Sequence, residues 1–183
     1  MFDNAFRDPL EILREVRTAT GGSFAALVQE FGFSILPFEH IPLEAFAELL
    51  ATLRSVELST NAEAWKLIHA LQPNWHMVSG DQQAALRPVL VEAFCRLPGP
   101  TGAMVIAELL GEKYCDAEAL SQLIHLSVHA PMPARALVPH GLKSLAQATT
   151  DDSLRQSAVA QLKVLKKDPQ SEVRREAALA LGG

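Results

Sequence analysis

Cysteine, long apolar runs and a strong excess of one charge are all scarce in this sequence. Its 183 residues include two cysteines, Cys95 and Cys115, too few for the disulfide framework of a small secreted domain. No apolar run approaches the ~18 residues that a membrane-spanning helix needs, and the first residues lack the basic region and apolar stretch of a secretory signal. We therefore expect a soluble, cytoplasmic protein with no membrane partner.

The net charge of −5 is unevenly distributed. Residues 1–80 hold ten acids and five bases, whereas residues 151–183 hold five acids and six bases. No basic block stands out to attract phosphates, which argues against a nucleic-acid partner. The acidic N-terminal part is either a solvated face that aids solubility or a surface that steers the chain toward a protein partner with a basic surface.

Helical signals run along almost the whole chain, and no stretch alternates with the period of two that a strand requires. Residues 42–57, for example, place Phe46, Leu49 and Leu53 on one helical face. The sequence therefore predicts an all-α fold. Residues 1–80 are expected to form either two degenerate helical hairpins, 9–31 and 42–72, or an unrelated helical cap.

From residue 80 onward the sequence repeats itself. Asp81, Asp116 and Asp151 follow one another at intervals of 35 residues, and each is expected to open a helical segment. A proline break divides each unit, and the predicted units are 81–115, 116–150 and 151–183, with helices over 82–97, 101–111, 117–129, 133–148, 152–167 and 170–181. Repeats of this length predict an α-solenoid of stacked antiparallel hairpins, because one hairpin does not bury its apolar face without a neighbour. Together with residues 1–80 we expect one continuous domain.

Two further prolines, Pro88 and Pro139, fall inside predicted helices. A proline in a helix interior removes one backbone hydrogen bond and clashes with the preceding turn. We therefore expect both helices to kink at these positions.

Residues 168–182, Asp-Pro-Gln-Ser-Glu-Val-Arg-Arg-Glu-Ala-Ala-Leu-Ala-Leu-Gly, carry an Asp-Pro start, a Val-Arg pair and an Ala-Leu-Gly ending. This segment resembles the second helix of a HEAT repeat, in particular the short PBS-lyase-like type. Asp168 is expected to cap the helix and Pro169 to start it. The resemblance implies that Arg174 bonds an aspartate or a backbone carbonyl in the neighbouring repeat, as part of a structural ladder.

Candidate chemical groups are few. His125 and His129 stand four residues apart, the spacing that places two imidazoles on one helical face for zinc. No further ligand motif accompanies them, and a metal site needs three or four convergent ligands, so we predict no metal, no cofactor and no catalytic residue. The two cysteines carry no family signature and are expected to be small buried residues.

Two connecting segments are unusually rich in apolar residues. Residues 31–42 include Phe38 and Glu39, and residues 73–80 include Trp75 and His76. Either these loops pack as lids over helix ends, or their aromatic groups anchor a protein partner, as exposed aromatic residues in loops often do.

The fold and these loops together predict a non-catalytic protein-interaction module, an adaptor, scaffold or inhibitor of the immunity-protein kind, that binds its partner along a solenoid groove. One alternative is a HEAT-like enzyme or ligand-binding protein, similar to bilin lyases or, less in keeping with the charge pattern, to DNA glycosylases. A second alternative is a fragment or self-associating unit of a longer array, forming a homodimer through the C-terminal helix at residues 171–181.

Overall fold

A computed structural model describes residues 43–55, 58, 68–69, 71–97 and 99–182, and every regular element in these residues is helical. No strand occurs among them, so the all-α prediction is confirmed for this part of the chain. Its seven α-helices are α3 (Leu43–Arg54), α5 (Gly80–Phe94), α6 (Pro100–Leu109), α7 (Ala117–His129), α8 (Val138–Ala148), α9 (Asp152–Leu165) and α10 (Ser171–Ala180). The helices predicted before residue 42, the loop at residues 31–42 and most of residues 56–67 lie outside the described residues.

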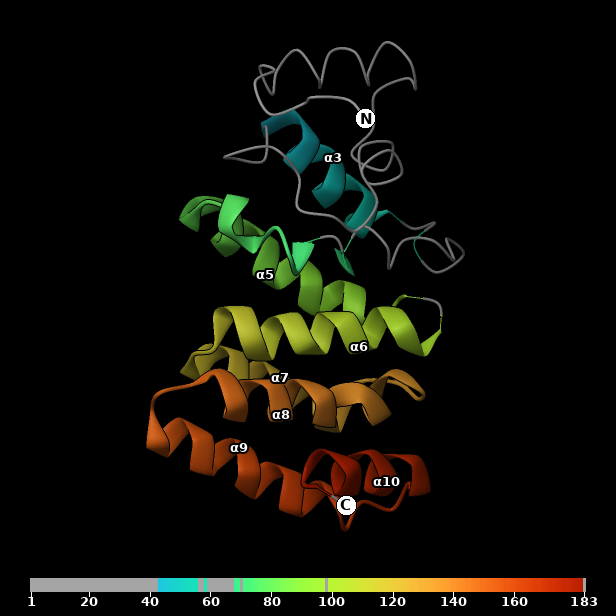
Figure 1. The fold of residues 1–183 in the computed structure, drawn as a ribbon. Coiled ribbons are helices and arrows are strands. Elements are labelled where there is room, and N and C mark those ends of the chain that lie inside the picture. Colours follow the sequence, from blue (N-terminus) through green and yellow to red (C-terminus); the bar gives the residue numbers. More distant parts are fainter. Residues whose placement is uncertain (1–42, 56–57, 59–67, 70, 98, 183) are drawn as a thin grey trace, which may run out of the picture.

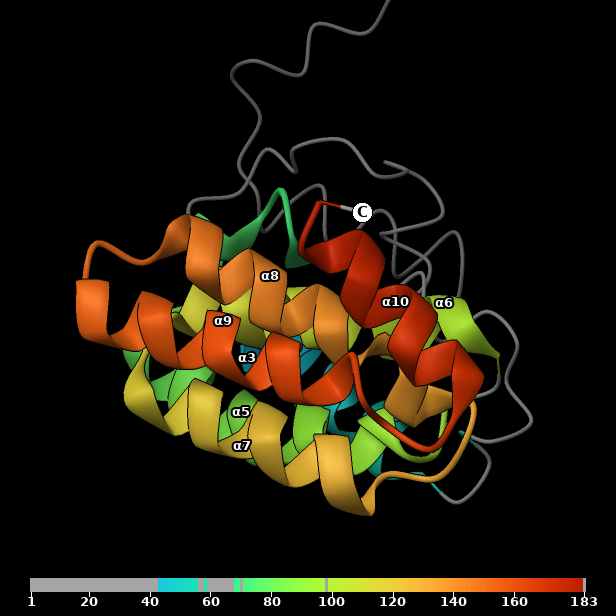
Figure 2. The same ribbon diagram turned by 90° about the horizontal axis from the view of Figure 1, so that it is seen from below.

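The helices follow one another through the molecule in chain order, from α3 at one end to α9 and α10 at the other (Figure 1). Helix α5 packs between α3 and α6, α6 packs on α8, and α8 packs on α9 and α10. Seen along this row, α5, α7 and α9 lie on one side and α6, α8 and α10 on the other (Figure 2). No helix in the described residues is long and apolar enough to cross a membrane.

Two of the three predicted aspartates cap helices. The Asp116 carboxylate accepts a hydrogen bond from the Ala119 N–H at 2.7 Å and begins α7. The Asp151 carboxylate accepts from the N–H groups of Ser153 and Leu154 at 2.8 and 3.2 Å and begins α9. Both bonds satisfy backbone donors that have no partner inside the helix.

Asp81 does not have the same role. Helix α5 begins two residues earlier, where the Ser79 hydroxyl accepts from the Gln82 N–H at 3.3 Å and the Gln82 side-chain oxygen accepts from the Ser79 N–H at 3.0 Å. This reciprocal capping box needs a separation of three residues, which Ser79 and Gln82 provide. Asp81 lies exposed in the first turn, so the predicted helix start at Asp81 is wrong.

The two prolines predicted inside helices, Pro88 and Pro139, occupy different positions relative to their helices. Pro88 lies inside α5, as predicted. Pro139 instead occupies the first turn of α8, because a 3₁₀ turn at residues 134–137 precedes the helix. A proline there costs no intrahelical hydrogen bond, so the predicted kink at Pro139 is wrong.

Helix α6 continues into a π-helical turn, Leu110–Tyr114, that crosses α8 at two glycines. A Cβ atom on Gly111 would lie 2.0 Å from the carbonyl oxygen of Gly141. A Cβ atom on Gly141 would lie 2.5 Å from the carbonyl oxygen of Ala107. The two helical segments therefore meet backbone against backbone, at a separation that only glycine permits at both positions.

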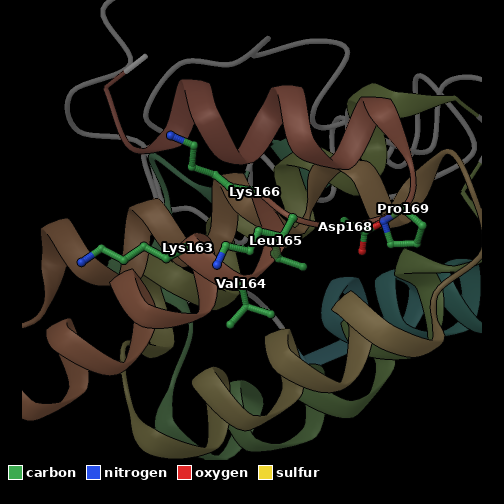
Figure 3. A pocket seen from close by; sticks show the side chains of 7 residues that line it. Lys163, Val164, Leu165, Lys166, Asp168 and Pro169 are labelled. Atoms are coloured by element: carbon green, nitrogen blue, oxygen red, sulfur yellow. The ribbon is translucent and has the colours of Figure 1, made fainter.

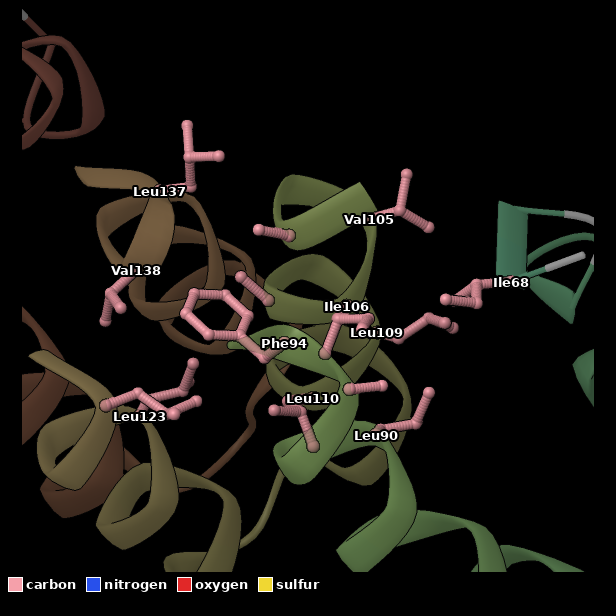
Figure 4. Packing of buried hydrophobic residues seen from close by; sticks show 14 of the residues in the cluster. Ile68, Leu90, Phe94, Val105, Ile106, Leu109, Leu110, Leu123, Leu137 and Val138 are labelled. Atoms are coloured by element: carbon pink, nitrogen blue, oxygen red, sulfur yellow. The ribbon is translucent and has the colours of Figure 1, made fainter. Parts of the chain in front are cut away.

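Around this crossing the apolar side chains form one continuous core. Phe94, at the end of α5, is fully buried, and Figure 4 shows its ring among side chains from later helices, including Ile106, Leu123 and Val138. Burying a side chain of this size stabilises a fold by about 1.5–3 kcal/mol. The core therefore ties α5 to α6, α7 and α8.

Arginines add polar links between neighbouring hairpins. The Arg155 guanidinium donates to the carbonyl oxygens of Ala146 and Thr149, at the end of α8, at 3.3 and 2.6 Å. Arg135, in the turn before α8, bonds the carboxylate of Asp168, in the turn after α9. These side chains satisfy carbonyl groups and a buried carboxylate that the helices leave without intrahelical partners.

The segment that resembles a HEAT repeat differs in detail from the expectation. Helix α10 begins at Ser171 with Gln170 as its cap residue, and Asp168 accepts from the Gln170 N–H at 2.9 Å in the turn before it. Arg174 donates to the carbonyl oxygens of Asp168 and Pro169 at 2.7 and 2.8 Å. Both acceptors lie within its own hairpin, so the expected bond from Arg174 to the neighbouring repeat is wrong. The link between the two hairpins is the bond from Arg135 to the buried carboxylate of Asp168.

Because of the glycine crossing, a methyl group added at Gly141 should destabilise the protein, whereas one added at a glycine outside the crossing should not. Gly141→Ala should lower the free energy of unfolding by about 3 kcal/mol, because the added carbon meets backbone atoms that have no room to move. Gly80→Ala is the matched control, since nothing lies within 4 Å of its Cβ position, and it should be neutral or stabilising by up to about 1 kcal/mol. Urea unfolding followed by circular dichroism checks both, and equal midpoints for the two variants would contradict the crossing.

Candidate functional site

The structure separates the residues that the sequence suggested for partner binding. Phe38 and Glu39 lie outside the described residues. Trp75 lies in a 3₁₀ turn at residues 75–77, half-buried, with its ring edge-on to Tyr114 at 5.1 Å between centroids. His76 beside it is exposed. Trp75 is thus packed against the rest of the molecule, and its role in partner binding stays a prediction.

Tyr114 belongs to a larger cluster centred on Arg87. The Arg87 guanidinium lies 4.3 Å from the centre of the Tyr114 ring, and the Tyr114 hydroxyl donates to the Gln83 carbonyl at 2.8 Å. Arg87 also bonds the carboxylates of Asp116 and Glu118 at 2.6 and 2.7 Å. Its side chain is only 12% exposed, and the cluster lines a cleft of about 470 Å³ between α5 and α7.

The pKa values in this cluster follow from burial and pairing. Burial by itself would raise the pKa of Asp116, but hydrogen bonds from Arg87 and the Ala119 N–H outweigh it and lower the pKa. Burial would lower the pKa of Arg87, and the bond to Asp116 reverses this direction. Burial raises the pKa of Tyr114. Arg87 and Asp116 are therefore a charged pair, whereas Tyr114 is a neutral hydrogen-bond donor.

The charged groups in this cleft hold α5 and α7 together. Three of the donor contacts of Arg87 go to carboxylates of α7 and its cap, so its positive charge is already neutralised. Asp116 likewise serves two partners at once, Arg87 and the first turn of α7. We assign the cluster to stability and orientation of α5 against α7.

The histidine pair lies on the outer side of α7. His125 and His129 are both exposed, and their ring centres are 4.3 Å apart. Within the described part of the chain, no group of three or more His, Cys, Asp or Glu side chains is arranged to hold a metal ion. The two imidazoles could supply two ligands of a site, and the described residues add no third. Cys95 and Cys115 are free thiols, exposed and half-buried respectively, so the expectation that both are buried is wrong.

A more distinctive surface is formed by apolar side chains that remain exposed on α7, on α9 and in the turn after α7. Val128 and Val164 are each 61% exposed, and they occupy corresponding places on two neighbouring helices. A hydrogen bond of 3.1 Å from the Gln161 amide to the buried Ser127 hydroxyl joins these two helices. We call this surface the α7–α9 face; its exposed apolar members are Ile124, Val128, Met132 and Val164.

Lysines border the α7–α9 face at the end of α9. Residues 163–169 line an open cleft of about 820 Å³ there, and Figure 3 shows the side chains of Lys163, Val164 and Lys166 leaving the chain in three different directions. Lys163 and Lys167 are exposed beside Val164. Positively charged residues therefore lie next to the apolar Val164 along the chain.

Sequence reasoning did not identify this face, although a signal was present. The buried stripe of α7 includes Ala119, Leu123 and Leu126. Ile124 and Val128 are one turn apart and form a second apolar stripe, which is separate from the buried stripe. A helix with two apolar stripes either contacts two neighbours or leaves one stripe exposed, and the exposed stripe is the outcome here.

The chain matches no protein-family model, no curated protein and no solved structure. The resemblance of residues 168–182 to a HEAT repeat therefore stays a prediction from the residues themselves.

The Arg87 cluster should contribute strongly to stability. Arg87→Met should lower the free energy of unfolding by about 2 kcal/mol, because it removes a cation–π contact and leaves two carboxylates without their partner. Lys143→Met is the control: Lys143 is an exposed residue of α8, so the change should stay within about 0.5 kcal/mol. Chemical denaturation measures both, and a loss for Arg87→Met as small as that for Lys143→Met would refute this role.

The lowered pKa of Asp116 predicts a pH dependence with a definite sign. The stabilisation from the ionised carboxylate is present above the unfolded pKa of about 3.9 and is lost as the pH falls through the lower pKa of the folded chain. Asp116→Asn keeps a capping side chain but lacks the charge. The stability difference between the two proteins should therefore shrink below about pH 4. Urea titrations across this range measure it, and a difference independent of pH would argue against the ion pair.

Proposed function

We propose that this chain is a non-catalytic protein-interaction module whose helical hairpins form a HEAT-like α-solenoid, and that its partner binds on the α7–α9 face. In such a stack each hairpin covers the apolar side of the next, and the outer surfaces of successive helices form an extended platform. Binding then depends on the side chains that this platform presents.

Three features support the solenoid part of the proposal. The units 81–115, 116–150 and 151–183 each contain two helices separated by a proline-containing turn. Their first helices, α5, α7 and α9, lie on one side of the row. Arginines connect successive units, from Arg87 to Asp116 and from Arg135 to Asp168.

The observation that carries the binding proposal is the pair of exposed valines. Val128 and Val164 come from the first helices of consecutive units, are the second-last residues of α7 and α9, and are exposed to the same extent. Exposed apolar groups that gather across two elements are typical of surfaces that bind another protein, whereas single exposed apolar residues need no explanation. Ile124 and Met132 extend the apolar surface along and beyond α7.

This binding surface lies away from the loops that the sequence favoured. Trp75 packs against Tyr114, which supports its interpretation as a lid. The expected partner with a basic surface rested on the acidic excess of residues 1–80, most of which lie outside the described residues. That expectation concerns a different part of the chain from the α7–α9 face.

Affinity capture tests the proposal. The full chain, immobilised, should recover a stoichiometric protein partner from lysate of the cells that naturally make it, and the double variant Val128→Asp/Val164→Asp should lose that partner. Both side chains are exposed, so the unfolding temperature of the variant should change by less than about 3 °C. The measurement is quantitative mass spectrometry of the bound proteins.

The matched control is Leu179→Asp, which places the same charge at another exposed apolar residue, 58% exposed on α10. This control should retain the partner. Recovery of the same proteins by all three chains, or of no stoichiometric protein by any of them, would contradict the proposed function.

A further inference from the structure

We propose that the α7–α9 face binds an acidic amphipathic helix of a protein partner. This inference rests on the proposed function and specifies the chemistry of what binds there.

Acidic side chains are missing from the stretches of chain that form this face. Residues 119–150 contain no aspartate or glutamate, and neither do residues 153–167. The nearest carboxylate after α9 is that of Asp168, which is buried and paired with Arg135. Three exposed lysines lie close to Val164 in the chain: Lys163 in the last turn of α9, and Lys166 and Lys167 directly after the helix. The segments of this face therefore attract negative charge.

Lysines at this position have a second effect that is independent of any partner. They lie at the C-terminal end of α9, where positive side chains complement the partial negative charge of the helix end. By themselves they would therefore not indicate a binding site. Val164, which is 61% exposed between them, has no comparable electrostatic role at the helix end, and it belongs to a group of exposed apolar residues with Ile124 and Val128.

The arrangement of the helices suits a third helix. Helices α7 and α9 are direct neighbours joined by the Gln161–Ser127 bond, and each carries an exposed valine, Val128 on α7 and Val164 on α9. Ile124 and Val128 are four residues apart, which places them on the same side of α7 one turn from each other. An amphipathic helix presents its own apolar residues at the same spacing, and acidic residues flanking its stripe would face Lys163 and Lys167.

A protein fits this surface better than a nucleic acid. Phosphate recognition relies on many lysines and arginines along a groove, whereas four apolar residues dominate here and the basic groups lie at one end. Apolar contacts would supply the affinity, and the lysines would select an acidic partner over a basic one.

Two synthetic peptides test this selectivity on the full chain. Each is a labelled helix of about 20 residues with leucines at positions i, i+4, i+7 and i+11; one carries glutamates beside this stripe and the other carries lysines. Fluorescence anisotropy should show that the glutamate peptide binds about tenfold or more tightly than the lysine peptide at low salt. The difference should shrink at about 1 M salt, where charges are screened within a few ångströms.

Three variants locate the effect. Lys163→Glu/Lys167→Glu should weaken binding of the glutamate peptide about tenfold and strengthen binding of the lysine peptide. Val128→Asp/Val164→Asp should weaken binding of the glutamate peptide at least as much. Lys143→Glu is the matched control, an exposed lysine on α8, and it should leave both affinities unchanged. Circular dichroism confirms that each variant keeps its helical content.

Several outcomes would overturn the inference. These are equal binding of the two peptides, no binding of either, a glutamate preference that survives Lys163→Glu/Lys167→Glu, and tighter binding of a DNA duplex than of the glutamate peptide. A dimer of the full chain that Val128→Asp/Val164→Asp dissociates would assign the face to a second copy and also overturn it. None of the peptide outcomes changes the capture result, which uses the natural partner and therefore decides the proposed function separately.

Discussion

The contact between Gly111 and Gly141 is the constraint on which the rest of the described structure depends. It brings the backbone of the π-helical turn against the backbone of α8, closer than any side chain would allow. The turn also ends in Cys115, whose backbone is left-handed with φ of 46°, and the chain leaves it to begin α7 at the Asp116 cap. The same few residues thus set the separation of α6 and α8 and the starting point of α7.

Neighbouring interactions build outward from this crossing. On one side, Tyr114 extends from the π-helical turn to Gln83 and Arg87 of α5, and Trp75 packs on its ring. On the other side, α8 packs on α9 and α10. Apolar burial supplies most of the favourable free energy, while the arginine bonds satisfy polar groups that would be costly to leave buried without partners. The α7–α9 face is an apolar surface that this scheme leaves exposed.

Much of the fold could be predicted from the sequence, because its signals are local. Helix-capping residues such as Asp116 and Asp151 act on the next few residues, and buried stripes such as Phe46, Leu49 and Leu53 follow from helical periodicity alone. The errors at Asp81 and Pro139 were also local, since in each case a neighbouring turn moved the helix start by a few residues.

What the sequence did not reveal depends on residues that are distant in the chain. Nothing in the sequence around Gly111 or Gly141 indicates that the two glycines are in contact. The bond between Arg135 and Asp168 likewise joins residues of two different hairpins. The α7–α9 face was missed for the same reason: a second apolar stripe on α7 becomes a candidate site only once packing shows which stripe remains uncovered. The sequence favoured two loops as binding sites because of their aromatic residues, but in the structure the aromatic ring of Trp75 packs against Tyr114.

Native-state hydrogen exchange of the unaltered chain tests the central claim most directly, because it measures how stability is distributed along the row of helices. The account predicts that amides of α6, of the π-helical turn and of α8 exchange most slowly and with similar opening free energies, and that protection decreases toward α10. The slowest exchange in α10, or clearly different opening free energies for α6 and α8, would contradict the view that the glycine crossing holds the fold together.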